Sequence, residues 1–407
     1  MTDSSSWEPR ALATASHESV DRLAWYAEAG LLLREQDGAY APDSLHRLRL
    51  IRYARQRGIS DEDLALATKE QGDLLGIFED LTPHDTRIHD LDQAAATAGV
   101  PAPLLNELIH LLGLDDERDS VSQDDIDALN LLGQALALGI PEEALLQLIR
   151  VFADVTERLA DAQVRIFHDH VHEQFRAAGM SGRQLLESTE AIGKPALALV
   201  EPAITYFHRR AWQKANRDDF LRHLAEATTP PPARPGDATA AVMFVDLAGF
   251  TPLTLALGDH GVADVLRVFS LTVRDVCSRH GGRIIKQIGD AFMLVFDRAA
   301  DAVAFGANLE RTASDIGDLP GLHIGAHWGT VLYREGDYYG NGVNLAARIA
   351  SSTDPDQFLI SQDLAHAAGP TEAVHLIALP PRELKGVDQP VAVVEVQPAA
   401  AHELDDG

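Results

Sequence analysis

The stretch Arg283-Ile-Ile-Lys-Gln-Ile-Gly-Asp-Ala-Phe-Met-Leu-Val-Phe296 predicts a β-hairpin. Two apolar, β-branched runs flank Gly289-Asp290, and a two-residue loop that begins with glycine suits the tight turn between antiparallel strands. The strands themselves do not need Lys286, which stands four residues before Asp290. The hairpin therefore places a cation and an anion at one end of a sheet, where polyphosphate chemistry would use both.

Strands and helices alternate around this hairpin. The expected strands are Ala241–Val245, Leu322–Tyr333 (a strand or a bent hairpin) and Val391–Val396, and the expected helices are residues 261–280, 299–314 and 341–352. The order βαββαβ with additions predicts a ferredoxin-like domain.

The first half of the chain has a different periodicity. From about Val20 to Leu224, apolar residues recur at spacings of three and four with breaks at Gly or Pro, which predicts a nearly all-helical half. The pattern stops at Thr228-Thr-Pro-Pro-Pro-Ala-Arg-Pro-Gly236, which cannot continue a helix and predicts a short, stiff linker. The expected fold class is α+β, with an all-α N-terminal domain followed by the ferredoxin-like domain.

The composition restricts the possible functions. Among 407 residues there are 34 Lys and Arg against 62 Asp and Glu, and the net charge of −28 disfavours nucleic acid and anionic membranes as partners. No apolar run approaches the ~20 residues of a membrane span, and the N-terminus lacks the character of a signal peptide. With one cysteine, Cys277, no intrachain disulfide is possible, which fits a cytoplasmic protein. The helical pattern around Cys277 predicts that it is a core residue.

Two aspartates are candidate metal ligands. Asp246 ends the first predicted strand and precedes a glycine-containing turn and a helix, where its oxygens lie beside free backbone N–H groups. If the hairpin lies next to that strand, Asp290 supplies a second carboxylate. Two carboxylates with few other protein ligands suit Mg²⁺, which keeps waters and substrate phosphates in its coordination shell.

A third motif is Gly336-Asp-Tyr-Tyr-Gly-Asn-Gly-Val-Asn-Leu-Ala-Ala-Arg348. Asn344 and Arg348 stand four residues apart on the expected helix, so their side chains project from one face. An amide and a guanidinium there could bind a ribose oxygen and a negative charge that develops on phosphorus. Taken singly, Arg348 could equally form a surface ion pair, and Asn344 could be a polar residue near a helix N-terminus.

Together the three motifs resemble the signature motifs of class III nucleotidyl cyclases. The matching segments are Phe244–Thr251, Lys286–Asp290 and Asp337–Arg348, and the resemblance covers residues 238–396. In that family the active site lies between two catalytic domains. Because one chain here carries the complete set of residues, the resemblance implies a homodimer with two sites.

The resemblance also implies a role for each motif residue. Asp246 and Asp290 would bind two ions of Mg²⁺ or Mn²⁺, Lys286 and Asp337 would recognise adenine, Asn344 would orient the ribose, Arg348 would stabilise the transition state, and Lys385 and Phe250 would contact the substrate. His327 is expected to be a structural residue in a strand.

The residues Lys286 and Asp337 favour adenine over guanine as the base that they bind. Adenine N1 accepts a hydrogen bond and its N6 amino group donates one, which Lys286 and Asp337 match. The guanylate-cyclising branch of the family typically has Glu and Cys at these places, so a guanylate cyclase is disfavoured. The expected reaction converts ATP to 3′,5′-cyclic AMP and pyrophosphate.

The helical half carries two further resemblances. Residues 21–72 resemble a MerR-type winged helix, a DNA-binding module, and residues 95–143 resemble the regulatory domain of actinobacterial soluble adenylate cyclases, a family known for pH-dependent autoinhibition and a fatty-acid-binding pocket. We therefore expect a sensory or autoinhibitory half with a proton, lipid or protein effector.

The basic residues of the MerR-like segment are few for a DNA-binding surface. They are Arg47, Arg49, Arg52, Arg55 and Arg57. We interpret this segment as a module kept for packing. The alternative is a DNA-binding regulator with a nucleotide-sensing, cyclase-like domain.

Histidines cluster at His168-Asp-His-Val-His172 in a long helical stretch, residues 141–176. His168 and His172 share a helix face and could bind a metal or sense protons. No Cys or further His follows at ligand spacing, so we interpret them as exposed side chains without a ligand.

These observations predict five segments. They are a MerR-like module at 1–90, a regulatory domain with a connecting helix at 91–227, a linker at 228–237, a catalytic domain at 238–398 and an acidic tail at 399–407.

Overall fold

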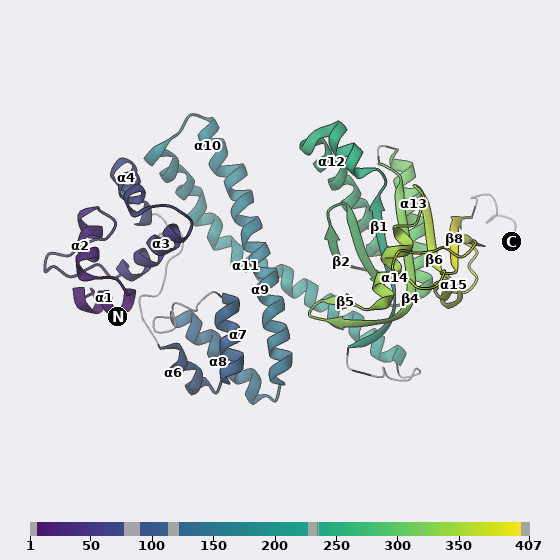
Figure 1. Ribbon diagram of the computed structural model, residues 1–407, viewed down its shortest axis with the longest axis horizontal. Coiled ribbons are helices and arrows are strands. Elements are labelled where there is room, and N and C mark those ends of the chain that lie inside the picture. Colours follow the sequence, from purple (N-terminus) through teal and green to yellow (C-terminus); the bar gives the residue numbers. More distant parts are fainter. Residues whose placement is uncertain are drawn as a thin grey trace. The chain divides into compact units, whose positions relative to one another are not determined.

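The computed structural model describes residues 6–76, 90–112, 122–226, 234, 236–317 and 319–399, and the chain divides into two compact units between Thr228 and Thr229 (Figure 1). The first unit is mainly helical and the second contains a sheet with helices, so the predicted fold class is confirmed. Most of the predicted linker and of the acidic tail lies outside the described residues.

The N-terminal unit contains two groups of helices and a long helical hairpin. The first group is α1 (Pro9–Ser16), α2 (Val20–Glu28), α3 (Ser44–Gln56) and α4 (Asp61–Gln71). The second group is α6 (Leu91–Ala98), α7 (Ala102–Leu112) and α8 (Gln123–Ala137). The hairpin consists of α9 (Glu142–Phe167), the π-helical turn η1 (His168–His172), α10 (Glu173–Ala177) and α11 (Gly182–Glu226). Side chains of Ser19, Ser60, Asp90 and Ser122 cap α2, α4, α6 and α8 by accepting a hydrogen bond from the backbone three residues later.

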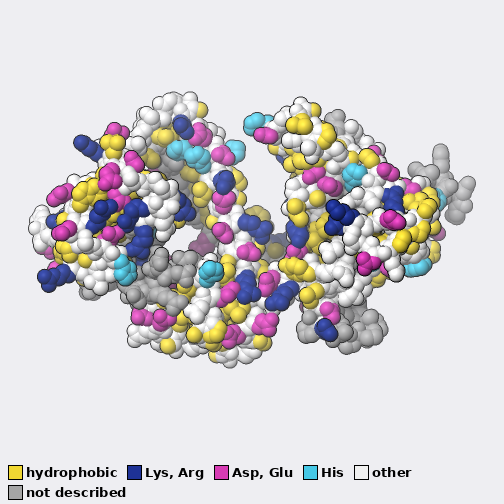
Figure 2. Space-filling view, in the orientation of Figure 1, with side chains coloured by type: hydrophobic (Ala, Val, Ile, Leu, Met, Phe, Trp, Pro, Cys, Tyr) yellow, Lys and Arg dark blue, Asp and Glu magenta, His cyan; other side chains and the backbone are white. Residues whose placement is uncertain are grey.

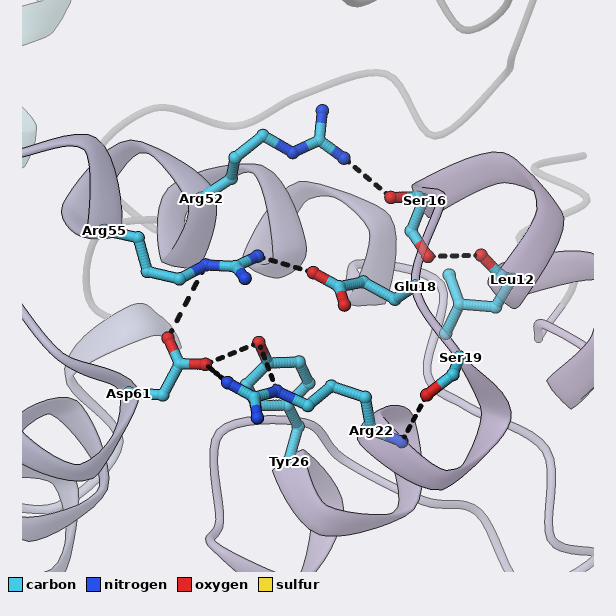
Figure 3. A network of polar contacts seen from close by, with 9 residues as sticks. All are labelled: Leu12, Ser16, Glu18, Ser19, Arg22, Tyr26, Arg52, Arg55 and Asp61. Atoms are coloured by element: carbon cyan, nitrogen blue, oxygen red, sulfur yellow. Dashed lines mark hydrogen bonds and ion pairs between the residues drawn. The ribbon is translucent and has the colours of Figure 1, made fainter.

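The first group of helices encloses its own core and a buried polar network (Figure 3). The side chain of Asp61 is only 1% exposed. It accepts a hydrogen bond of 2.8 Å from the Tyr26 hydroxyl and pairs with Arg22 and Arg55. Because a buried carboxylate without partners would be strongly destabilising, this network fixes how α2, α3 and α4 pack together.

Two details of the helical half differ from the prediction. α11 continues through Pro195 and Pro202 instead of breaking. Each proline removes one backbone hydrogen bond and crowds the carbonyl four residues earlier, but two such losses are a small fraction of the bonds in a helix of 45 residues. The predicted helix over residues 141–176 contains the π-helical turn η1, an irregularity that is common at functional sites. Among the described residues, no helix combines the length and apolar content of a membrane span.

The strands of the second unit, as far as it is described, form one eight-stranded sheet in the order β2-β3-β1-β4-β6-β8-β7, with β5 paired to β4. They are β1 (Asp237–Leu247), β2 (Arg283–Ile288), β3 (Ala291–Phe296), β4 (Leu322–Arg334), β5 (Asp337–Tyr339), β6 (Gln357–Ser361), β7 (Val374–Ala378) and β8 (Val393–Pro398). The β4–β6 pair is parallel and the other pairs are antiparallel. The first four strands have the βαββαβ connectivity and order of the predicted ferredoxin-like fold.

The helices cover the two faces of this sheet unequally. They are α12 (Phe250–Arg279), α13 (Ala299–Ile316), α14 (Asn341–Ala350) and α15 (Gln362–Ala368). Residues of α12, α13 and α15 form the larger core with Ala241, Met243 and Val245 of β1, and Cys277 is buried there as predicted.

The opposite face of the sheet carries α14 and a smaller cluster, here called the α14-side cluster. Its members are Ala240, Val242, Met293, Val295, Val331, Tyr338 and Ala346. Alternate residues of β1 therefore point to opposite faces. Since Asp246 has the parity of Val242, it lies on the α14 side of the sheet.

Candidate functional site

Asp246 and Asp290 meet at one end of the sheet. β1 pairs with β3 up to Val245 and Phe292, so the β2–β3 turn that carries Asp290 lies beside the end of β1. The two carboxyl groups are within hydrogen-bonding reach, and Asp246 Oδ1 also accepts a bond of 3.1 Å from the backbone N–H of Leu247. Burial, and then the hydrogen bond and charge of Asp290, raise the pKa of Asp246 to about 6.

This pair suits a hard divalent cation. Neither aspartate takes part in the ion pairs formed among the described residues, so no side-chain cation there offsets their charge. Because each carboxylate makes the charge of the other less favourable, a bound cation would stabilise the ionised pair. An all-oxygen donor set with few protein ligands favours Mg²⁺ or Mn²⁺ over Zn²⁺, as predicted from the sequence.

Lys286 and Asp337 form an ion pair, although 51 residues separate them in the sequence. A β-bulge at Ile285 shifts the β2–β3 register, so that Lys286 is paired with Met293 of the α14-side cluster. Without the extra residue, Lys286 would point to the opposite face, under α12 and α13. Asp337 begins β5, whose pairing with β4 brings it to the same side.

Asn344 and Arg348 lie on α14, one turn apart, and both side chains are exposed. α14 packs closely on the sheet, because a Cβ atom on Gly325 of β4 would lie 2.0 Å from the backbone nitrogen of Ala350. The helix therefore depends on a residue without a side chain at this point. The predicted helix that carries both residues is confirmed, and it lies on the face of the sheet that carries the Asp246–Asp290 pair and the Lys286–Asp337 ion pair.

Three other predicted residues lie apart from these contacts. Phe250 is partly buried against the larger core at the start of α12, and Lys385 is exposed between β7 and β8. Their roles in substrate binding stay predictions. His327 is buried and its Nδ1 lies 2.9 Å from Ser361 Oγ, which fits a structural role.

The arginines of the MerR-like segment are held mainly by partners inside the same unit. Arg47 is 2% exposed and bonds to Asp43 and to both oxygens of Asp73. Arg52 donates to the backbone oxygen of Ser16 at 2.6 Å, and Arg55 pairs with Glu18 and Asp61. Lys and Arg side chains on the visible face of this unit are interspersed with Asp and Glu (Figure 2). This arrangement fits a module that uses its cations for packing, while the absence of DNA binding stays a prediction.

The histidine pair stacks along the π-helical turn. The rings of His168 and His172 are 4.8 Å apart, and His172 Nδ1 lies 3.3 Å from Thr189 Oγ1 of α11. In the described part of the chain, no three His, Cys, Asp or Glu side chains form a cluster that could hold a metal ion. A role in proton sensing stays a prediction.

Sequence comparisons agree with the geometry of the sheet domain. Residues 234–394 match the profile of the adenylate and guanylate cyclase catalytic domain. An uncharacterized protein of Mycobacterium tuberculosis is 32% identical over 373 residues, which cover 86% of this chain and 90% of that protein. The chain belongs to the class III nucleotidyl cyclase family. The resemblance inferred from the three motifs is thus confirmed.

Other class III cyclases are more distant. An adenylate cyclase of Streptomyces coelicolor is 28% identical over 303 residues, covering 74% of each chain. The crystal structure of an adenylyl cyclase from P. aeruginosa is 22% identical, with a TM-score of 0.37, and covers 40% of this chain and 96% of its own. Class III cyclases act on nucleotides and use divalent metal ions, for which the Asp246–Asp290 pair provides suitable ligands.

The Asp246 carboxyl should titrate near pH 6 in the metal-free protein. The ordinary pKa of an aspartate is 3.8, and that of Asp246 in the folded protein is about 6. The folded state therefore holds this proton more tightly than the unfolded state, so the free energy of unfolding should fall as the pH rises from 3.8 to about 6. Asp290→Asn should lower the pKa of Asp246, because it removes the charge of Asp290, but the increase in pKa that burial causes should remain. The measurement is a carboxyl-carbon NMR titration, with Asp246→Asn used to assign the signal. A wild-type Asp246 that titrates at its ordinary value would contradict this account.

Proposed function

We propose that the chain is an adenylate cyclase that converts ATP to 3′,5′-cyclic AMP and pyrophosphate. The observation that carries the proposal is the pairing of Lys286 with Asp337 on the same side of the sheet as Asp246 and α14. Lys286 offers a donor for adenine N1, and Asp337 offers an acceptor for the N6 amino group. Relatives named adenylate cyclase support this choice over guanylate cyclase.

The side chains then have distinct tasks. Lys286 and Asp337 give up their ion pair and form hydrogen bonds with the edge of the purine. Asn344 donates a hydrogen bond to a ribose oxygen. Arg348 offsets the negative charge that moves from the α-phosphate to the leaving pyrophosphate as the ribose 3′-oxygen bonds to the α-phosphorus. Asp246 and Asp290 would hold the divalent cations, two per site, and these would supply Lewis acidity toward the ribose hydroxyl and the phosphates.

A symmetric homodimer is part of the proposal. In the family, metal ligands come from one catalytic domain, and the purine contacts, Asn and Arg come from the other. One chain here carries both sets, so two copies would form two equivalent sites. Asp290 would then serve one site and Lys286, four residues earlier on the same hairpin, would serve the other.

The N-terminal unit is proposed to regulate this activity in response to protons or a lipid. The supporting comparison is a protein of M. tuberculosis named pH-sensitive adenylate cyclase, 22% identical over 384 residues that cover 90% of this chain. The identity of the effector and a cytoplasmic location stay predictions.

The purified chain should form cyclic AMP from ATP in the presence of Mg²⁺ or Mn²⁺, with slower turnover of GTP. Arg348→Ala should still fold and bind ATP, but kcat should fall by roughly 10²–10³, the usual effect of removing one charge-stabilising donor. Chromatographic product analysis and steady-state kinetics measure both effects. Equal use of ATP and GTP would refute the purine assignment, and wild-type turnover by Arg348→Ala would refute its role.

Mixing two inactive variants tests the dimer. Asp246→Asn and Arg348→Ala damage opposite halves of each shared site, so a mixed dimer should contain one intact site. With random exchange of subunits, activity should return to about a quarter of the wild-type value. A mixture of Asp246→Asn with Asp290→Asn is the matched control, because both changes damage the same half. Failure of the first mixture to gain activity, with subunit exchange demonstrated by differently labelled chains, would contradict shared sites.

A further inference from the structure

A chain of hydrogen bonds joins β2, which carries Lys286, to β5, which carries Asp337. The two oxygens of Asp297 each accept a bond of 2.7 Å from the Arg283 guanidinium. Arg283 Nη2 also donates to the Tyr338 hydroxyl at 2.9 Å. The chain Asp297–Arg283–Tyr338 therefore ends at the residue next to Asp337. The Arg283–Tyr338 contact leaves no local signal in the sequence, because it joins residues 55 positions apart.

Strand register places this chain on the same face as Lys286. Arg283 is paired with Val295 and Lys286 with Met293, and both partners belong to the α14-side cluster. Asp297 follows β3 two residues after Val295, so Arg283 and Asp297 form a diagonal cross-strand pair on that face. The bidentate contact ties the two strands together at the end of the hairpin opposite the Gly289-Asp290 turn.

Tyr338 is buried and contacts Asp337 directly. The side chain of Tyr338 is 8% exposed within the α14-side cluster, and its ring lies 5.1 Å from that of Tyr333. Its backbone N–H donates to Asp337 Oδ1 at 2.8 Å. β5 is only three residues long and pairs with β4 alone. Among the described residues, two side-chain contacts link β5 to β2: the Lys286–Asp337 ion pair and the Arg283–Tyr338 hydrogen bond.

We infer that Arg283 and Tyr338 are positioning residues for purine selection, because they hold β5 against β2 so that Lys286 and Asp337 face the base at a fixed separation. The inference rests on the proposed function, in which this pair recognises adenine. The Lys286 ammonium is a point charge on a flexible stem, so its discrimination between N1 of adenine and N1–H of guanine depends on where the partner carboxylate is held. Burial also raises the pKa of Tyr338, against the opposing effect of Arg283, so the hydroxyl stays protonated at neutral pH.

Tyr338→Phe removes the hydroxyl and keeps the ring in its cluster. In the full-length chain, this change should lower the preference for ATP over GTP roughly tenfold, through a higher KM for ATP with kcat nearly unchanged, because purine contacts act in both the ground state and the transition state. Arg283→Lys should have a similar effect, since a lysine cannot bridge Asp297 and Tyr338 with one planar fork. The matched control is Tyr339→Phe, the same chemical change at the exposed next residue of β5, which should leave the preference unchanged.

A double mutant and a binding assay complete the test. In an Asp337→Ala background, Tyr338→Phe should cause no further loss of purine preference, because the carboxylate that Tyr338 positions is already absent. Binding of fluorescent ATP and GTP analogues measures the preference independently of turnover. If the wild type prefers ATP and both variants keep that preference, or if Tyr338→Phe causes a further loss in the Asp337→Ala background, the positioning role is wrong. If wild-type binding shows no preference, the adenine assignment of the proposed function is wrong and the positioning role with it.

Discussion

Two carboxyl groups approach each other closely at the end of β1, and the rest of the second unit has to stabilise this unfavourable contact. Asp246 and Asp290 repel each other when both are ionised, and partial burial makes the charge more costly. Antiparallel pairing of β1 with β3 enforces the contact. The larger core opposes its cost, because it buries several phenylalanines completely, each of which would cost about 3–5 kcal/mol to truncate to alanine. They are Phe269, Phe292, Phe296, Phe305 and Phe358. The sheet can therefore hold a locally unfavourable pair that a cation would relieve.

Because successive side chains of a β-strand point to opposite faces of the sheet, the core residues and the candidate site residues of β1 lie on different faces. From Ala241 to Leu247, the odd-numbered residues of β1 enter the larger core, whereas Asp246 follows the parity of the α14-side cluster. The bulge at Ile285 then moves Lys286 to that same side. A cation, an anion pair and the polar face of α14 thus come together on one side of the sheet, while the packing that stabilises the sheet lies mainly on the other.

Local patterns in the sequence were enough to predict the elements that place the site. The Gly-first turn, the strand before Asp246 and the four-residue spacing of Asn344 and Arg348 are short-range features, and the structure contains each of them. The bulge at Ile285 was not predictable, because it depends on how β2 pairs with β3. The short elements β6, α15 and β7 were also missed, since five to seven residues carry too little periodicity. Contacts between distant segments, such as Arg283 with Tyr338, leave no local signal.

We propose that Asp246 and Asp290 form a cation site and not merely a structural pair. A Mn²⁺ titration followed by electron paramagnetic resonance tests it most directly, with Asp315→Asn as a control for unspecific binding to a chain of net charge −28. We expect the wild type and Asp315→Asn to take up Mn²⁺ with equal affinity in the presence of ATP. Asp246→Asn should lose that site while remaining folded. Undiminished Mn²⁺ binding by Asp246→Asn would show that the two carboxyl groups are not a cation site.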